Sequence, residues 1–200
     1  MVGHSAKPKN CGSTPHPARM ELQFDEEKHE YSRNNIIIPG VTTILRKVGI
    51  IDYGPFVTPG KGERLHKIVQ NYLEGTLNWE AISIEEMEAL TRFCELAGKY
   101  EFAECEKILE NKVYNYAGKC DYVSDAYVGD LKTGKPEPWH LLQLAAYVYC
   151  FHGEKYGMLI YMNEKKNPVR EYTYQELKES FKHFIYALDV YNFQIGGQNG

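Results

Sequence analysis

The sequence predicts an α/β protein in which α-helices flank a central mixed β-sheet. Apolar side chains recur every three or four residues in some segments and every second residue in others, which are the periods of helices and of strands. The segments follow the order strand region, two helices, three strands, helix, strand, helix. This order favours a sheet with helices packed on its faces.

The N-terminal half is expected to hold short strands and then two helices. Alternating apolar residues over 22–38 predict strands joined by turns. An apolar face of helical period over 62–75 predicts the first helix. Ser83 and Glu86 have the spacing of a capping box, so a second helix is expected from there to Gly98.

The C-terminal half is expected to hold three strands, a helix, a strand and a final helix. The strands are predicted at Ala103–Leu109, Tyr116–Val123 and Ala126–Lys132, the helix at Trp139–His152 and the fourth strand at Tyr156–Met162. Thr173 and Glu176 again have capping-box spacing and predict the start of the last helix.

Length and composition indicate one globular domain. The chain has 200 residues, 43% of them hydrophobic and 25% charged, a balance that excludes a disordered chain. Residues 1–19 lack periodicity, so we expect a flexible arm there and a single domain over 20–200. No apolar run approaches membrane-spanning length and no signal peptide opens the chain, so we expect a cytoplasmic protein, in a bacterial host cell, without a membrane partner.

Charge and cysteine content narrow the possible functions. The five cysteines include no C-x-x-C pair, which argues against a disulfide framework, a zinc ribbon and an iron–sulfur cluster. The formal net charge is -4, so no overall positive charge attracts nucleic acid. A polyanionic partner would have to be bound by a local basic strip, by metal ions or by both.

The chemistry is concentrated on two neighbouring predicted strands. Asp130 and Lys132 are two residues apart, so both side chains leave the same face of their strand. Asp121 lies on the strand of the same hairpin and can approach Asp130. Two close carboxylates repel unless a cation lies between them, and oxygen ligands suit Mg²⁺ or Mn²⁺. Glu104 and Glu106 share a face of the preceding strand, so either could reach this site.

Each residue also has an ordinary structural explanation. A D-x-K strand is usually a solvated face or a surface ion pair. Gln143 and Tyr147 are one turn apart in an apolar helix, where a polar edge and a core aromatic are common. His66 lies one position off an apolar stripe, as boundary histidines do. The order of the pieces along the chain is more informative than any one of them.

In that order the sequence resembles the PD-(D/E)xK nucleases, within them the RecB-like and phage-type exonucleases. The resemblance extends from about Tyr31 to Tyr147. It rests on Pro39–Leu45 (PGVTTIL), Gly62–His66 (a G-x-x-x-H helix start), Glu106, Ala117–Asp121 (AGKCD), Gly129–Gly134 (GDLKTG) and Gln143–Tyr147 (QLAAY). It implies a restriction-endonuclease-like fold and a phosphodiesterase that depends on a divalent metal ion.

The resemblance implies a role for each matching residue. Asp121, Asp130, the Leu131 carbonyl and His66 would hold the metal. Lys132 would orient or deprotonate the attacking water. The remaining roles are a metal-bound water or second ion for Glu106, and positioning of the DNA strand or support of the site for Gln143 and Tyr147.

The sequence also departs from the family pattern. The literal Pro-Asp pair is absent, because Asp121 follows Cys120. Gly40 stands where relatives commonly have Ser before Val-Thr, which would weaken a helix cap there. The cysteine quartet of the iron–sulfur subgroup is missing, so no such cofactor is expected.

Basic residues near the His66 helix are candidates for phosphate contacts. Lys61, Arg64 and Lys67 are the first choice, and further candidates are Arg46, Lys47, Lys165, Lys166 and Arg170. Neighbouring acids make ordinary surface residues an equally good explanation for each. The expected partner is a single- or double-stranded DNA end, together with phage recombination or replication proteins.

Three functions therefore compete. The first is a metal-dependent DNA nuclease, an exonuclease of phage or prophage origin. The second is a nucleic-acid-binding module on the same fold that has lost its chemistry, and the intact Asp121, Asp130 and Lys132 argue against it. The third is a hydrolase of small phosphoesters, which a shallow site without basic walls would favour.

Overall fold

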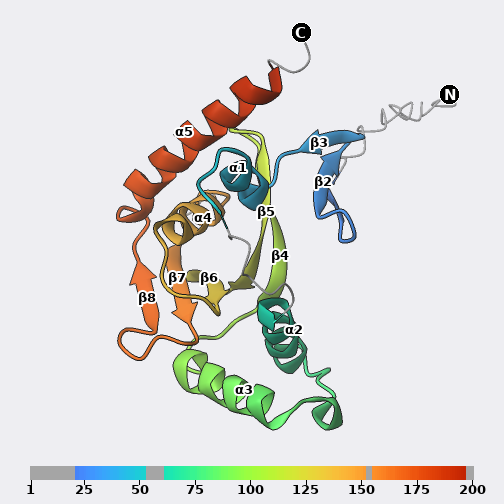
Figure 1. Ribbon diagram of the computed structural model, residues 1–200, viewed down its shortest axis with the longest axis vertical. Coiled ribbons are helices and arrows are strands. Elements are labelled where there is room, and N and C mark those ends of the chain that lie inside the picture. Colours follow the sequence, from blue (N-terminus) through green and yellow to red (C-terminus); the bar gives the residue numbers. More distant parts are fainter. Residues whose placement is uncertain (1–20, 53–60, 152–154, 197–200) are drawn as a thin grey trace, which may run out of the picture.

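Figure 1 shows the computed structural model, which describes residues 21–52, 61–151 and 155–196. A mixed five-stranded sheet is flanked by helices, and a three-stranded antiparallel sheet precedes it in the chain. The predicted α/β class is confirmed. The expected arm at 1–19 lies outside the described residues.

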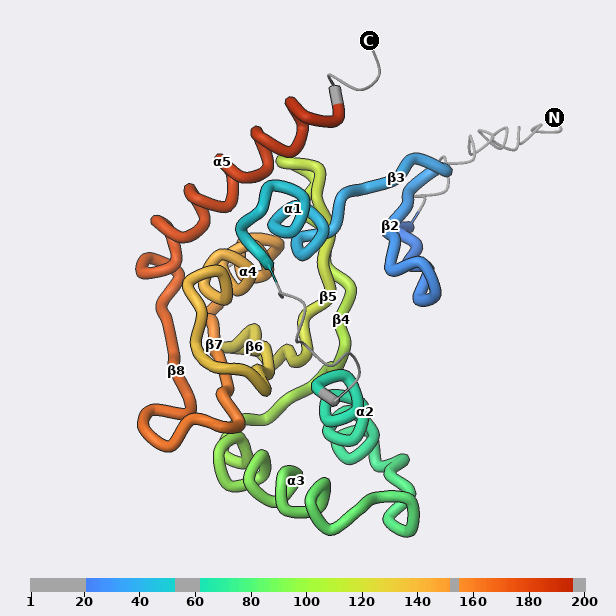
Figure 2. The backbone as a smooth tube through the Cα atoms, viewed as in Figure 1, coloured from blue at the N-terminus to red at the C-terminus, as the bar shows by residue number. Residues whose placement is uncertain are grey.

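The small sheet contains β1 (Gln23–Asp25), β2 (Glu30–Arg33) and β3 (Ile36–Ile38) in that order. Asn34 and Asn35 join β2 to β3 and have φ values of 55° and 62°, the backbone that a two-residue hairpin turn requires and that asparagine tolerates. The sheet packs on β5 of the main sheet, because the buried residues of one small cluster are Tyr31, Ile38 and Ala117. It lies on the opposite side of β5 from α4 (Figure 2).

The main sheet has the order β4-β5-β6-β7-β8. Its strands are β4 (Glu104–Asn111), β5 (Tyr116–Val123), β6 (Tyr127–Lys132), β7 (Tyr156–Tyr161) and β8 (Val169–Tyr172). Only the β6–β7 pair is parallel among these described strands. The four predicted strands are confirmed. The edge strand β8 was not predicted, because four half-exposed residues give too short a pattern.

Helices cover both faces of this sheet. They are α1 (Val41–Lys47), α2 (Lys61–Leu73), α3 (Ile84–Ala97), α4 (Pro138–Val148) and α5 (Leu177–Gly196), with a 3-10 turn at Trp79–Ala81. One core cluster joins α1, α4 and α5 to the sheet, and a second joins α2 and α3. In Figure 1, α2 and α3 accordingly lie apart from the other three.

Both predicted capping boxes are confirmed, while one helix ends earlier than expected and one helix was not predicted. Ser83 and Glu86 form both hydrogen bonds of the capping box, and Thr173 and Glu176 bond reciprocally before α5. Helix α4 ends at Val148, four residues before the predicted end. Helix α1 was not predicted from periodicity, although the family resemblance implied a helix cap at Gly40. Its N-cap residue is Gly40, which provides no side-chain cap. A Cβ at Gly40 would lie 3.0 Å from the Tyr31 ring, so glycine permits the packing of the small sheet.

At Glu106 and Asp121 the regular alternation of side chains between the two faces of the sheet is broken. A regular strand would place Cys120 and Val123 on opposite faces, but both belong to the α4-side cluster, while Tyr122 belongs to the α2-side cluster. Glu106 lies opposite Asp121, has φ 50°, and is missing from an otherwise continuous register. A left-handed residue turns the strand. Glu104 and Glu106 consequently do not act as residues of one face.

β5 and β6 form a fork. They pair at Tyr122–Gly129 and Val123–Val128, and the described ladder ends there. Beyond this point the chain before α1 lies along the edge of β5, where the Ala117 N–H donates to the Pro39 carbonyl at 2.9 Å. The start of α1 therefore lies next to the start of β5, at the open end of the fork.

Candidate metal centre

The first feature of the fork is a side chain that replaces a backbone hydrogen bond. Continuing the register would set Asp121 opposite Asp130, but the Asp121 Oδ2 atom instead accepts the Leu131 N–H at 2.5 Å. A strand residue directs its N–H and C=O to the same edge. The Leu131 carbonyl therefore faces the fork, on the side expected for a ligand.

Three side chains from three elements meet at the fork. His66 of α2 places its Nδ1 atom 3.0 Å from Asp121 Oδ1. Ligand atoms of His66, Glu106 and Asp121 all lie within 4.8 Å of one another. One imidazole and two carboxylates of this spacing are compatible with a divalent cation. The sequence-based expectation had grouped His66 and Asp121 with Asp130, whereas Glu106 completes the group in the structure.

The His66–Asp121 contact sets the charge state of both groups. Burial acts to lower the pKa of His66, but the charge of Asp121 and its hydrogen bond outweigh burial and raise this pKa to about 9. Burial acts to raise the pKa of Asp121, and His66, the Leu131 N–H and Lys132 together hold it below its ordinary value. Without a metal, the pair is thus an imidazolium and a carboxylate at neutral pH.

Asp130 and Lys132 form the other half of the site. The Lys132 Nζ atom forms an ion pair with Asp130 Oδ2, as their shared strand face predicted. That oxygen is buried and has no partner of hydrogen-bond geometry among the described residues. Burial raises the pKa of Asp130 to about 6, against the opposing effect of Lys132. The ring of Trp139 lies 5.1 Å from Lys132 Nζ.

Gln143 fixes the position of Lys132 from helix α4. Its Oε1 atom accepts a hydrogen bond from Lys132 Nζ at 2.6 Å. Its Nε2 atom donates to the Tyr147 hydroxyl at 2.9 Å and to Thr42 Oγ1 at 3.3 Å. These two acceptors hold the amide so that its oxygen faces Lys132. Thr42 was not among the expected site residues. It lies in the PGVTTIL segment that carries part of the family resemblance, but without a predicted helix α1 nothing indicated where its side chain would lie.

Of the two roles expected for Tyr147, support of the site fits its position better than contact with DNA. Its side chain is buried, with 3% of the residue exposed, so its role is to orient Gln143. The packing requires Gly118 on β5, because a Cβ at Gly118 would lie 2.5 Å from the Tyr147 ring. The glycine of the AGKCD segment therefore serves close packing beneath the site.

The three basic residues expected to contact phosphate differ in their surroundings. Arg64 forms an ion pair with Glu86 and donates to the Ala81 carbonyl at 3.2 Å, so its guanidinium already joins α2 to α3. Lys67 donates to Gln70 at 2.9 Å and keeps its charge at the surface. The Lys61 side chain lies outside the described residues.

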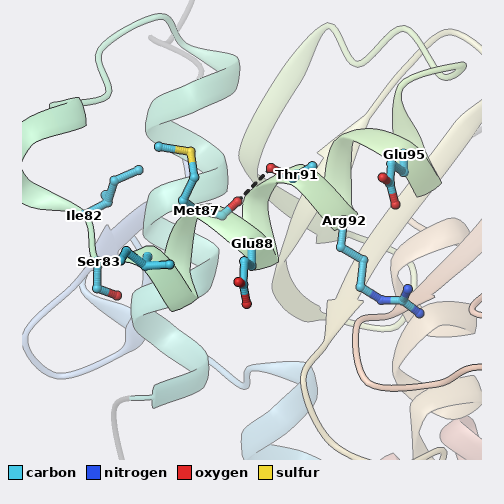
Figure 3. A pocket seen from close by; sticks show the side chains of 8 residues that line it. Ile82, Ser83, Met87, Glu88, Thr91, Arg92 and Glu95 are labelled. Carbon is cyan, nitrogen blue, oxygen red and sulfur yellow. Dashed lines mark hydrogen bonds between the residues drawn. The ribbon is translucent and has the colours of Figure 1, made fainter.

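One surface cavity lies away from this centre. It has a volume of about 380 Å³ and lies on the outer face of α3 (Figure 3), where Thr91 donates to the Met87 carbonyl at 2.9 Å. Its lining is Ile82, Ser83, Ile84, Met87, Glu88, Thr91, Arg92 and Glu95. None of these residues belongs to the fork, so this cavity is separate from the candidate metal site.

Comparison with known proteins adds no family assignment. No protein-family model matches the chain, and no curated protein matches it. Within the described residues, no helix is both long and apolar enough to span a membrane. The four cysteines described, Cys94, Cys105, Cys120 and Cys150, are free thiols.

Proposed function

We propose that the protein is a divalent-metal-dependent DNA nuclease that hydrolyses phosphodiester bonds, and that it acts as an exonuclease of phage or prophage origin. The observation that carries this proposal is the fork between β5 and β6. It brings the His66, Glu106 and Asp121 group together with the Asp130–Lys132 pair. The first group suits a cation, and the second holds an ammonium group beside it.

The residues present fit a divalent ion. The donor set offers two carboxylates and an imidazole, and the buried Asp130 carboxylate, whose Oδ2 atom is ion-paired with Lys132, adds a further negative charge beside it. His66, Glu106, Asp121, Asp130 and the Leu131 carbonyl would hold Mg²⁺ or Mn²⁺. A bound ion of this kind supplies charge stabilisation at the phosphoryl oxygen and lowers the pKa of a bound water. The imidazole favours Mn²⁺ over Mg²⁺.

Lys132 acts on the attacking water or on a phosphoryl oxygen. An ammonium group has three N–H donors. One donates to Gln143 and another faces Asp130, which leaves one for the substrate. Because Gln143 is itself held by Tyr147 and Thr42, the ammonium is fixed before the substrate arrives. Such preorganisation avoids an entropic cost during the reaction.

The test is cleavage of end-labelled single- and double-stranded DNA with Mg²⁺, Mn²⁺ or EDTA. We expect cleavage with either ion and none with EDTA. Lys132→Met and Asp130→Asn should each lower the rate by about 10²–10⁴-fold with circular dichroism unchanged. Lys107→Met is the matched control, since Lys107 pairs with Glu104 at the exposed edge of β4.

Two outcomes would contradict the proposal. Full activity of Lys132→Met would remove Lys132 from the mechanism and, with it, the assignment of the fork as the catalytic site. Hydrolysis of bis(p-nitrophenyl) phosphate without cleavage of either DNA would instead favour a hydrolase of small phosphoesters. The length of the labelled products separates removal of terminal nucleotides from internal cleavage.

A further inference from the structure

The Glu106 carboxylate of the His66, Glu106 and Asp121 group is held by Lys119, a residue that was not among the expected site residues. Lys119 of β5 forms an ion pair with Glu106 Oε2. Both side chains are largely covered, with 25% of Lys119 and 20% of Glu106 exposed. Ion pairs withdrawn from solvent are screened less than surface pairs, so this contact restricts where the Glu106 carboxylate lies.

Glu106 needs such a restraint because its backbone is irregular. It has φ 50°, a left-handed conformation, and it is missing from the ladder between Cys105–Tyr122 and Lys107–Cys120. It also lies close to the Asp121 carboxylate. Like charges at short range repel, so an unpaired Glu106 would turn its carboxylate away from the site. The Lys119 ammonium offsets that repulsion.

The lysine is in turn placed by the small N-terminal sheet. Lys119 Nζ lies 5.3 Å from the centre of the Phe24 ring on β1, within the range of a cation–π interaction. Phe24 packs on the buried Tyr31 ring with 4.7 Å between ring centres, and Tyr31 belongs to the cluster around Ala117. A chain of contacts thus links the small sheet to Glu106.

We propose that Lys119 is a positioning residue for Glu106 and that Phe24, through Lys119, makes the N-terminal sheet part of the metal centre. This inference rests on the proposed function, since it concerns how the same site holds its ion. It extends that function by adding two residues that contact neither the ion nor the substrate. The small sheet, which otherwise only packs on β5, gains a role in cation affinity.

The experiment measures Mn²⁺ binding without DNA, by electron paramagnetic resonance of the free ion. Lys119→Met keeps the side-chain length and removes the charge. We expect Mn²⁺ affinity to fall about 10-fold, the lower limit for partners of metal ligands. Lys119→Arg should restore most of the affinity, and Lys107→Met, which breaks the exposed pair with Glu104, should leave it unchanged.

Phe24 is tested through the same measurement. Phe24→Leu keeps an apolar side chain and removes the ring face, so it should weaken Mn²⁺ binding less than Lys119→Met does. The double variant should bind no more weakly than Lys119→Met alone, because Phe24 acts through the lysine. Melting temperatures in EDTA establish that each variant is folded, and Lys119→Arg and Phe24→Leu carry the test if Lys119→Met does not fold.

The outcomes separate this inference from the proposed function. If the wild-type protein binds Mn²⁺ and folded Lys119→Met binds it equally well or more tightly, Lys119 does not position Glu106 and the inference is wrong. Failure of Lys119→Arg to restore affinity would also contradict it. If the wild-type protein binds no Mn²⁺ at all, the metal-dependent function itself fails, and this inference with it.

Discussion

The two sides of β5 differ in how the sheet is built. Toward β4 the pairing extends from Glu104–Val123 to Asn111–Tyr116, broken only at Glu106 within this described hairpin. Toward β6 it consists of two pairs. The long ladder satisfies backbone groups with backbone groups. At the short one, an aspartate side chain takes over a hydrogen bond of Leu131, and space opens for side chains from α2 and α4.

We infer from this difference that the ladder toward β4 contributes mainly to the stability of the fold and the fork mainly to the proposed metal binding and catalysis. Substitutions in the fork should change metal binding and catalysis while the ladder toward β4 preserves the fold. Substitutions beneath the ladder should change the free energy of unfolding first. The four predictions below test that division, in order of decreasing effect.

The largest effect is expected at His66. His66→Gln keeps a hydrogen-bond donor for Asp121 but removes the imidazole ligand, so it should lower nuclease activity by more than the roughly 10–100-fold typical of a lost outer partner. His66→Ala should do the same. The measurement is the cleavage rate at saturating Mn²⁺, with His183→Gln on the exposed face of α5 as control. Wild-type activity in His66→Gln would place the imidazole outside the metal centre.

The next effect is expected on the ladder side, at Gly118. A methyl group there would meet the Tyr147 ring at 2.5 Å, so Gly118→Ala should lower the free energy of unfolding by about 2 kcal/mol. Urea denaturation measures this. Gly134→Ala is the control, since a Cβ at Gly134 meets no atom within 4 Å. Equal stability of both variants would show that the Tyr147 ring moves without cost.

The third prediction concerns acid stability and the buried His140 of helix α4. Burial, with the charges of Lys132 and Arg170, lowers the pKa of His140 to about 3. Its Nδ1 atom accepts the Glu137 N–H at 3.2 Å and lies 3.1 Å from the Tyr161 hydroxyl. The imidazole therefore remains neutral in the folded protein down to low pH.

The sign of the effect follows from proton counting. Below about pH 6.5 the unfolded chain binds a proton at His140 that the folded chain does not bind. The contribution of His140 is complete above pH 6.5 and is lost toward pH 3, by about 1 kcal/mol per pH unit. The difference in unfolding free energy between wild type and His140→Asn should therefore shrink from pH 7 to pH 5. A constant difference would contradict the lowered pKa.

The smallest effect is expected at the start of α3, which belongs to neither side of β5. Ser83→Ala removes the acceptor for the Glu86 N–H and should cost about 1 kcal/mol of stability. Mn²⁺ affinity and cleavage rate should not change. A loss of metal affinity in this variant would show that α3 is coupled to the fork through α2, and the division between the two regions would need revision.

The sequence by itself determined the strongly periodic elements and their order, but not α1 or β8. Strands and helices with a strong period were predicted because burial of one face imposes that period on the chain. The Asp130–Lys132 pair was predictable for the same reason, since residues two apart on a strand share a face. The Ser83–Glu86 box was predictable because a cap is a local hydrogen-bond pattern.

Tertiary structure decided which side chains meet. The left-handed Glu106 turns the strand and separates Glu104 from the site, and strict alternation cannot foresee such a reversal. The end of the β5–β6 ladder and the arrival of Thr42 and Lys119 at their partners depend on contacts distant in sequence. Local periodicity records which face of an element is buried, whereas partners across a fork are fixed only when the elements pack together.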